Sequence, residues 1–113
     1  MEENKQRVVH EYVPGKQLNL AHIIANPDKE LYTKLGISEA GAIGVLTLTP
    51  TETAIIAADI ATKSADVKIG YLDRFTGSLV IVGKVSDVEM AIQSVNSFFT
   101  EKLKFAVTEI TRS

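Results

Sequence analysis

The sequence predicts an α+β fold in which helices cover one face of a mixed or antiparallel β-sheet. Three observations support this fold class. Segments rich in β-forming residues alternate along the chain with segments of helical apolar spacing. The connection between two of the predicted strands spans only residues 73–77, which implies that these strands pair in antiparallel fashion. Behind residue 85, apolar side chains recur at mostly helical spacing.

The first predicted strand stands apart from the others. Extended segments are expected at residues 7–13, 17–24, 43–49, 67–72, 78–83 and 104–111. The turn signal Pro14-Gly15 separates the first of these from the rest, and a lone strand beside a turn is not stable in water. We therefore expect two units, an N-terminal extension of residues 1–16 that contributes a strand and a body of residues 17–113.

Two helix starts and one helix end are marked in the first half of the chain. Asn26 is predicted to cap a short helix with Pro27 at its first position, and Gly36 stands where that helix should end. Thr49 and Glu52 then form a capping-box pattern in front of an alanine-rich segment. Alanine-rich helices allow their neighbours to approach closely, so this helix is expected to pack tightly.

The last helix is predicted behind a second capping-box pattern, formed by Ser86 and Glu89. Its apolar residues at mostly helical spacing are Val88, Met90, Ala91, Ile92, Val95, Phe98 and Phe99. This spacing predicts an amphipathic helix that covers the sheet.

The composition is that of one small globular domain. The 113 residues are 45% hydrophobic and 23% charged, and the net charge of −2 comes without a basic stripe for nucleic acid. The absence of cysteine excludes disulfides and thiolate metal sites. No apolar run approaches the roughly 20 residues of a membrane span. We therefore expect a soluble, cytoplasmic protein without nucleic-acid or membrane partners.

Titratable residues form no recognisable catalytic set. The two histidines, His10 and His22, fall in predicted strands and have no carboxylate or second metal ligand at useful spacing. We interpret His22 as a packed, hydrogen-bonded residue. The acidic residues are scattered, and no strand-to-helix turn holds glycines in the order of a phosphate-binding loop. The sequence therefore predicts no catalytic activity, no metal and no cofactor.

The middle of the chain resembles the shell domain of bacterial microcompartments. Residues 57–65, AADIATKSA, look like the first long helix of that domain. Residues 67–71, VKIGY, resemble its second strand. Residues 77–88, GSLVIVGKVSDV, resemble its glycine-flanked strand and the Asp-Val start of the next helix. The order and spacing of these pieces together are specific to the family.

Both ends of the chain resemble the permuted subclass of these shell proteins. Residues 11–17, EYVPGKQ, and residues 20–27, LAHIIANP, are similar to the EutS and PduU types of ethanolamine and propanediol utilisation. The similarity extends to residues 42–44, 47–50 and 70–77. Residues 40–42 favour the ethanolamine type, whereas residues 60–64 read equally like the propanediol type. The resemblance implies a ferredoxin-like, circularly permuted shell domain.

The resemblance also implies a structural tile. Such proteins form homohexamers that pack edge to edge with neighbouring hexamers and other shell proteins, around encapsulated enzymes and an aldehyde intermediate. The lysine of the tile edge matches Lys63. The loop that lines the central pore matches Asp73, Arg74, Phe75, Thr76 and Gly77.

In the permuted subclass, the N-terminal strands of six subunits form a small parallel β-barrel over the axis. The matching residues are Val8, Val9, His10, Glu11, Tyr12 and Val13. Barrel closure removes the exposed edge that this strand would otherwise present. An inward ring of Glu11 side chains would be costly without partners, so we favour His10 and Tyr12 inside. The barrel is then expected to cap the axis.

Gly41 is a candidate hinge, because glycine absorbs backbone change more readily than any other residue. It precedes the strand at residues 43–49, where it could set the tilt between subunits. Three other functions remain open: a propanediol-utilisation tile of the same type, a ferredoxin-like regulatory module that binds a metabolite between subunits, and a small cyclase or isomerase. The module predicts a dimer or trimer and the enzyme predicts a cluster of titratable residues, so assembly state separates these alternatives.

Overall fold

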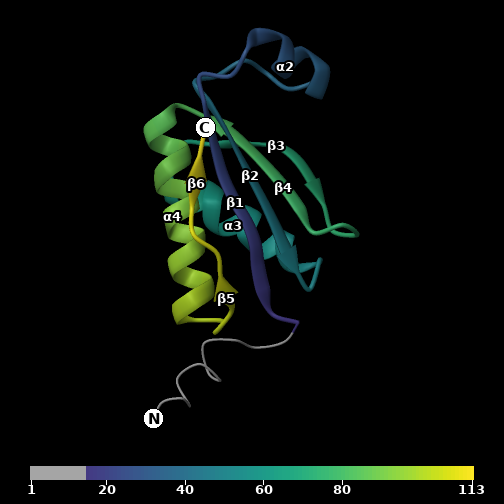
Figure 1. Ribbon diagram of the computed structural model, residues 1–113, viewed down its shortest axis with the longest axis vertical. Coiled ribbons are helices and arrows are strands. Elements are labelled where there is room, and N and C mark those ends of the chain that lie inside the picture. Colours follow the sequence, from purple (N-terminus) through teal and green to yellow (C-terminus); the bar gives the residue numbers. More distant parts are fainter. Residues whose placement is uncertain (1–14) are drawn as a thin grey trace.

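The fold is a single β-sheet with two long helices against it and a short helix beyond one end (Figure 1). The computed structural model describes residues 15–113. Its elements are β1 (Gln17–Ala25), α2 (Lys29–Leu35), β2 (Ala42–Thr49), α3 (Thr53–Ser64), β3 (Lys68–Asp73), β4 (Ser78–Gly83), α4 (Val85–Glu101), β5 (Ala106–Val107) and β6 (Thr111–Arg112). The strand order is β3-β4-β2-β1-β5, with β6 also pairing β1. The predicted α+β class is confirmed.

Four strands form the antiparallel part of the sheet. β1 pairs β2 from Gln17 opposite Thr49 to Ala25 opposite Ala42. β4 pairs β2 on its other side, and β3 closes the antiparallel set as the partner of β4. The short connection at residues 73–77 does join two antiparallel strands, as the sequence predicts. Most strand boundaries agree with the prediction to within about one residue, because turn residues bracket each apolar run.

The core lies between the sheet and the two long helices. α3 buries only alanines, namely Ala54, Ala57, Ala58 and Ala61, so its backbone lies close to the sheet. α4 buries larger side chains, and its Phe99 packs edge-on against Phe105 with ring centroids 4.8 Å apart. A Cβ on Gly44 would lie 2.9–3.0 Å from Ile81, Ile92 and Val88, so this glycine of β2 lets α4 approach the sheet.

The short helix α2 is anchored by a separate small cluster. Tyr32 is buried and its hydroxyl donates to the Ala40 carbonyl at 2.9 Å. Gly36 ends the helix in the left-handed region at φ 70°, as predicted. The predicted start was wrong: α2 begins at Lys29, and Asn26 instead ends β1 with φ 51°. The N–H of Asn26 donates to the Gly41 carbonyl, which keeps this residue at the end of the sheet.

Both capping-box predictions were also wrong. Thr49 lies in β2 and its hydroxyl donates to the side chain of Asn19 at 2.9 Å, while α3 begins at Thr53 without a side-chain cap. Ser86 lies inside α4, and the Glu89 carboxylate pairs with Arg112 of β6. In each case the polar side chain has a partner far away in sequence, which local pattern reasoning does not reveal.

The last predicted strand is divided in two. β5 and β6 both pair β1 in parallel, at Gln17–Leu18 and at His22–Ile23 respectively. Between them the Thr108 carbonyl accepts a hydrogen bond from the Asn96 side chain of α4 at 3.3 Å. The single strand expected at residues 104–111 is therefore interrupted, because α4 takes a carbonyl of the segment between the two short strands.

Candidate functional site

The loop at residues 73–77 is organised by the carboxylate of Asp73. The backbone N–H of Phe75 donates to Asp73 Oδ1 at 2.9 Å, and the Tyr71 hydroxyl donates to Oδ2 at 3.2 Å. The N–H of Gly77 donates a hydrogen bond to the Asp73 carbonyl at 2.9 Å. Gly77 has φ 78°, and a Cβ there would overlap the carbonyl oxygen of Leu48. The loop is thus a tight turn that requires glycine at its end.

The same hydrogen bonds shift the pKa values of Asp73 and Tyr71. The backbone N–H of Phe75 holds the pKa of the Asp73 carboxyl below its ordinary value, and the hydrogen bonds from Thr76 and Tyr71 act in the same direction. The carboxylate in turn raises the pKa of Tyr71, because the phenol donates to a negatively charged oxygen. Asp73 therefore remains charged while its oxygens are occupied within the loop.

The tip of the loop displays a cation on an aromatic ring. The guanidinium of Arg74 lies 4.9 Å from the centroid of the Phe75 ring, within the range of a cation–π contact. Phe75 is 77% exposed, the largest exposed fraction among the large hydrophobic residues that the structure describes as exposed. A shallow hollow between the loop and α3 is lined by Ile55, Leu72, Asp73, Arg74 and Phe75.

The predicted tile-edge lysine lies on an open surface. Lys63 is in the last turn of α3, where its charge complements the helix dipole. Its amine lies 3.0 Å from a carboxylate oxygen of Asp59, one helical turn earlier. Both side chains are exposed, so this pair orients Lys63 without withdrawing it from contact.

The predicted hinge residue is held by hydrogen bonds on both sides. Gly41 donates to the Gly83 carbonyl at 3.1 Å and accepts from the N–H of Asn26 at 2.9 Å. A Cβ at Gly41 would lie 3.4 Å from backbone atoms of Lys84 and Val85, which is close contact without overlap. Gly41 thus joins three segments at one end of the sheet.

His22 is a hydrogen-bonded structural residue, as predicted. Its Nδ1 lies 2.6 Å from the hydroxyl of Thr111, and its Nε2 lies 2.8 Å from the hydroxyl of Ser113. Both ring nitrogens are therefore occupied by the C-terminal segment. Within residues 15–113, no group of three or more histidine, aspartate or glutamate side chains is placed to hold a metal ion.

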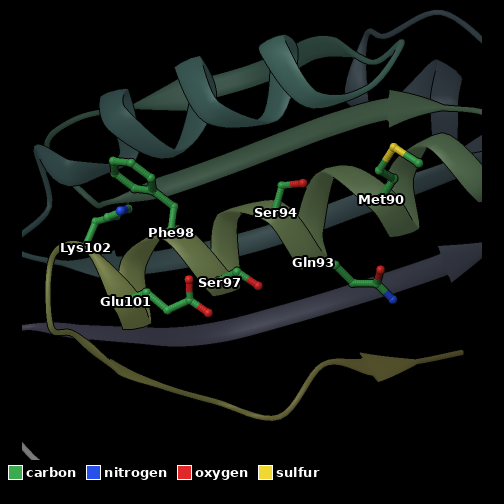
Figure 2. Close-up of a pocket in the computed structure, with 7 residues that line it drawn as sticks. All are labelled: Met90, Gln93, Ser94, Ser97, Phe98, Glu101 and Lys102. Atoms are coloured by element: carbon green, nitrogen blue, oxygen red, sulfur yellow. The ribbon is translucent and has the colours of Figure 1, made fainter.

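The outer face of α4 carries a shallow hollow of mixed character (Figure 2). Its lining comprises Met90, Gln93, Ser94, Ser97, Phe98, Glu101 and Lys102. Figure 2 shows these side chains distributed along the helix rather than converging on one point. The lining contains hydroxyls, an acid and an amine, but side chains spread along the helix do not form the convergent geometry that a catalytic set requires.

Several predicted features lie outside the described residues. These are the axial barrel residues Val8, Val9, His10, Glu11, Tyr12 and Val13, and most of the extension at residues 1–16. The described residues also add what the sequence did not reveal, since Ile55, Ile69 and Leu72 are exposed although their patterns resemble those of core residues. Across residues 15–113, no helix combines the length and apolarity needed to cross a bilayer.

Comparison with known proteins identifies the class of this fold. Residues 42–111, which run from β2 to β6, match the BMC domain family. The chain is 54% identical to the bacterial microcompartment shell protein EutS of Salmonella typhimurium, over 97% of this chain and 99% of EutS. It is 56% identical to the shell protein PduU of the same organism, over 95% of this chain and 93% of PduU.

Solved structures agree with these relatives. A CutR flat hexamer subunit superposes with a TM-score of 0.85 at 48% identity, covering 89% of this chain and 86% of that chain. A CutR screw form gives the same TM-score at 47% identity, with 88% and 100% covered. A fused permuted hexameric shell protein from the RMM microcompartment shares the fold alone, with a TM-score of 0.69 at 22% identity over 74% of this chain and 48% of that chain.

The position of β1 fits a permuted chain. β1 precedes the matched residues 42–111, yet it lies inside the sheet between β2 and β5. The fold and the relatives together define a BMC-domain protein. The chain belongs to the bacterial microcompartment shell proteins, within the group that contains EutS, PduU and CutR.

Proposed function

We propose that this protein is a non-catalytic tile that forms homohexamers and packs edge to edge into a microcompartment shell. The observation that carries the proposal is the match to shell proteins along nearly the whole chain. One of these shell proteins, CutR, is 48% identical to this chain and forms a flat hexamer. The described residues offer hydrogen-bonded turns and apolar surface rather than a set of acid, base and nucleophile. This favours the tile over the enzyme and over the metabolite-binding regulatory module.

The compartment we propose is that of ethanolamine utilisation, with propanediol utilisation as the second candidate. EutS matches over 99% of its length and PduU over 93%, which favours the ethanolamine type. The identity to PduU is slightly higher, at 56% against 54%, and this favours the propanediol type. Complementation of a strain lacking each tile, scored by shell morphology, tests the assignment; rescue of only the propanediol shell would reverse it.

Within the hexamer, we propose that residues 73–77 surround the axis and that the barrel of residues 8–13 lies over it. The sheet register supports a common location. Gln17, at the start of β1, pairs Thr49, and Thr47 pairs Ser78 directly after the loop. The chain therefore enters the sheet at the end where the proposed pore loop lies (Figure 1). We further propose the division into a strand-contributing extension, residues 1–16, and a shell domain, residues 17–113.

Electron microscopy of the purified protein tests this arrangement. We expect six-fold particles with density over the axis for the full chain, and six-fold particles without that density for a variant that lacks residues 2–13. Particles with axial density in both samples would argue against the barrel. Absence of six-fold particles in the full-chain sample would argue against the tile itself.

Lys63 is proposed as a contact between neighbouring tiles, and Gly41 as the hinge that sets ring geometry. The exposure of Lys63 at the end of α3 supports the first role. The second is supported by the flat and screw forms of CutR, which indicate that this group of proteins adopts more than one assembly geometry. A Gly41→Val variant whose ring geometry matches the parent would argue against the hinge, and sheets of Lys63→Ala tiles as extensive as those of the parent would argue against the edge contact.

A further inference from the structure

The segment at residues 105–113 lies along β1 as a strap, and we call it the C-terminal strap (Figure 1). It pairs β1 in parallel only through β5 and β6, each of which is two residues long. On its other side, β1 pairs β2 along nearly its whole length. Short edge strands with exposed hydrogen bonds open at a lower free energy than the interior of a sheet. The strap is therefore the part of the sheet that separates most easily.

The strap is anchored at its two ends. At its start, Phe105 packs edge-on against Phe99 of α4. At its end, two hydroxyls of the strap hold the ring of His22 in β1. Residues 108–110, between these anchors, belong to neither short strand. Because the partners of both anchors lie in α4 and β1, these contacts need a strap but do not depend on which copy of the chain supplies it.

A short hinge joins the strap to the rest of the chain. α4 ends at Glu101, and residues 102–104 connect it to Phe105. Lys104 has φ 61°, in the left-handed region that residues with a side chain adopt at a cost. A short hinge under backbone strain favours exchange of the segment behind it between copies, because an extended hinge relieves that strain. The side chain of Lys104 is exposed, so this position can be changed without disturbing the core.

We propose that the C-terminal strap is exchangeable: it leaves β1 of its own subunit and pairs β1 of a second copy of this chain. Exchange forms the same contacts that it breaks, so its net cost in free energy is small. Fully extended, residues 105–113 reach roughly 30 Å, about the diameter of a small domain. The result is a mechanical link between two copies. The link does not depend on the proposed hexamer, since any two copies within this reach can exchange straps.

Pairs of single cysteines test the exchange, because the chain itself contains no cysteine. Gln17 of β1 and Ala106 of β5 are register neighbours, and both are half-buried. Neighbouring strands lie about 4.8 Å apart, which is within the range that a disulfide spans. In the double variant Gln17→Cys/Ala106→Cys, a disulfide within one chain reports a closed strap, and a disulfide between two chains reports an exchanged one.

The decisive sample is a mixture of the two single variants, Gln17→Cys and Ala106→Cys, refolded together from denaturant and then oxidised. We expect disulfide-linked dimers with one copy of each variant, identified by non-reducing electrophoresis and mass spectrometry. Thr47→Cys mixed with Ser78→Cys is the matched control, because these half-buried register neighbours join β2 to β4 inside the sheet. Relative to the corresponding double variants, we expect at least about fivefold fewer mixed dimers in the control, because interior strands do not open locally.

Equal relative yields from the two mixtures would indicate random contact and would overturn the exchange. Disulfides formed only within single chains, or none at all in the double variant, would overturn it too. If Ala106→Cys does not fold, His22→Cys with Thr111→Cys gives the same comparison at β6. Light scattering separates the exchange from the tile: mixed dimers without hexamers would remove only the tile, and hexamers without mixed dimers would remove only the exchange.

The hinge gives an independent reading of the same mechanism. Lys104→Gly relieves the left-handed strain of the closed form and should lower the yield of mixed dimers. Lys104→Val increases that strain, because a β-branched residue is least tolerant of a positive φ, and should raise the yield. Equal yields from the two hinge variants would show that strain at Lys104 does not drive the exchange.

Discussion

The two edges of the sheet are completed in different ways. Below, the edge at β5 and β6 is called the closed end and the edge at β3 the open end. At one end, β5 and β6 pair β1, the ring of His22 is hydrogen-bonded to two hydroxyls of the C-terminal segment, and Arg112 pairs with Glu89 of α4. At the other end, the outer edge of β3 has no partner within the described residues, and its apolar side chains are exposed. Within residues 15–113 the chain thus closes one edge of the sheet by itself and leaves the other edge unpaired. The same substitution is expected to affect folding at the closed end and assembly at the open end.

The largest effect is expected from a charge at the open edge. Ile69→Lys places an amine where the account requires an apolar contact, and an unpaired charge in an interface is strongly unfavourable. We expect the hexamer to dissociate to folded monomers, measured by light scattering and circular dichroism. Leu35→Lys is the matched control, because Leu35 is 50% exposed against 45% for Ile69 but lies on α2. Dissociation of both variants, or of neither, would contradict the difference between the two surfaces.

A smaller effect, on subunit stability, is expected from truncating an aromatic ring at the closed end. Phe105 is 8% exposed and packs against Phe99, so Phe105→Ala should lower the free energy of unfolding by about 3–5 kcal/mol. Phe75→Ala, at a ring that is 77% exposed, should change the stability of the single subunit by no more than about 0.5 kcal/mol. Denaturant titrations at several protein concentrations separate subunit stability from assembly. Equal losses for the two variants would contradict the account.

The hydrogen bonds of His22 should contribute less than the packing of Phe105. His22→Ala removes two hydrogen bonds to the C-terminal segment, each with a net contribution of about 0.5–1.5 kcal/mol. We expect faster amide hydrogen exchange in residues 111–113, measured by mass spectrometry, with the core of α4 unaffected. Glu109→Ala, at an exposed position of the same segment, should leave exchange unchanged.

The smallest effect is expected from lowering the pH, which acts on the loop at the open end of the sheet. The folded-state pKa of Asp73 lies below its ordinary value of 3.8, so the contribution of this carboxylate to loop order is present above that value. It is lost as the pH falls through the folded-state pKa. The amide proton of Phe75, followed by NMR, should therefore titrate with a midpoint below 3.8, and Asp73→Asn should abolish the transition. A midpoint at or above 3.8 would show that the carboxylate does not hold the loop.

Local features were predictable from the sequence and long-range partners were not. The β3–β4 turn and the end of α2 at Gly36 follow from glycine and turn signals that act within a few residues. The predicted caps failed because Thr49 bonds Asn19 and Glu89 pairs with Arg112, partners that only the fold brings near.

The open flank escaped sequence analysis for a similar reason. Ile69 and Leu72 have the residue types of a buried strand, and their exposure depends on where α3 ends its cover of the sheet. The pore-loop and tile-edge residues were predicted from family resemblance, since a single chain carries no signal of where its copies lie. The hinge at Gly41 was predicted from the backbone freedom of glycine. The residues that await a partner are therefore the ones for which one sequence is least informative.

We propose that this chain is a hexameric tile. The most direct test is the solution mass of the purified 113-residue chain by light scattering, with electron microscopy of the same sample. We expect six times the mass of the chain, with six-fold particles or sheets of them. A stable monomer, dimer or trimer at all concentrations would contradict it.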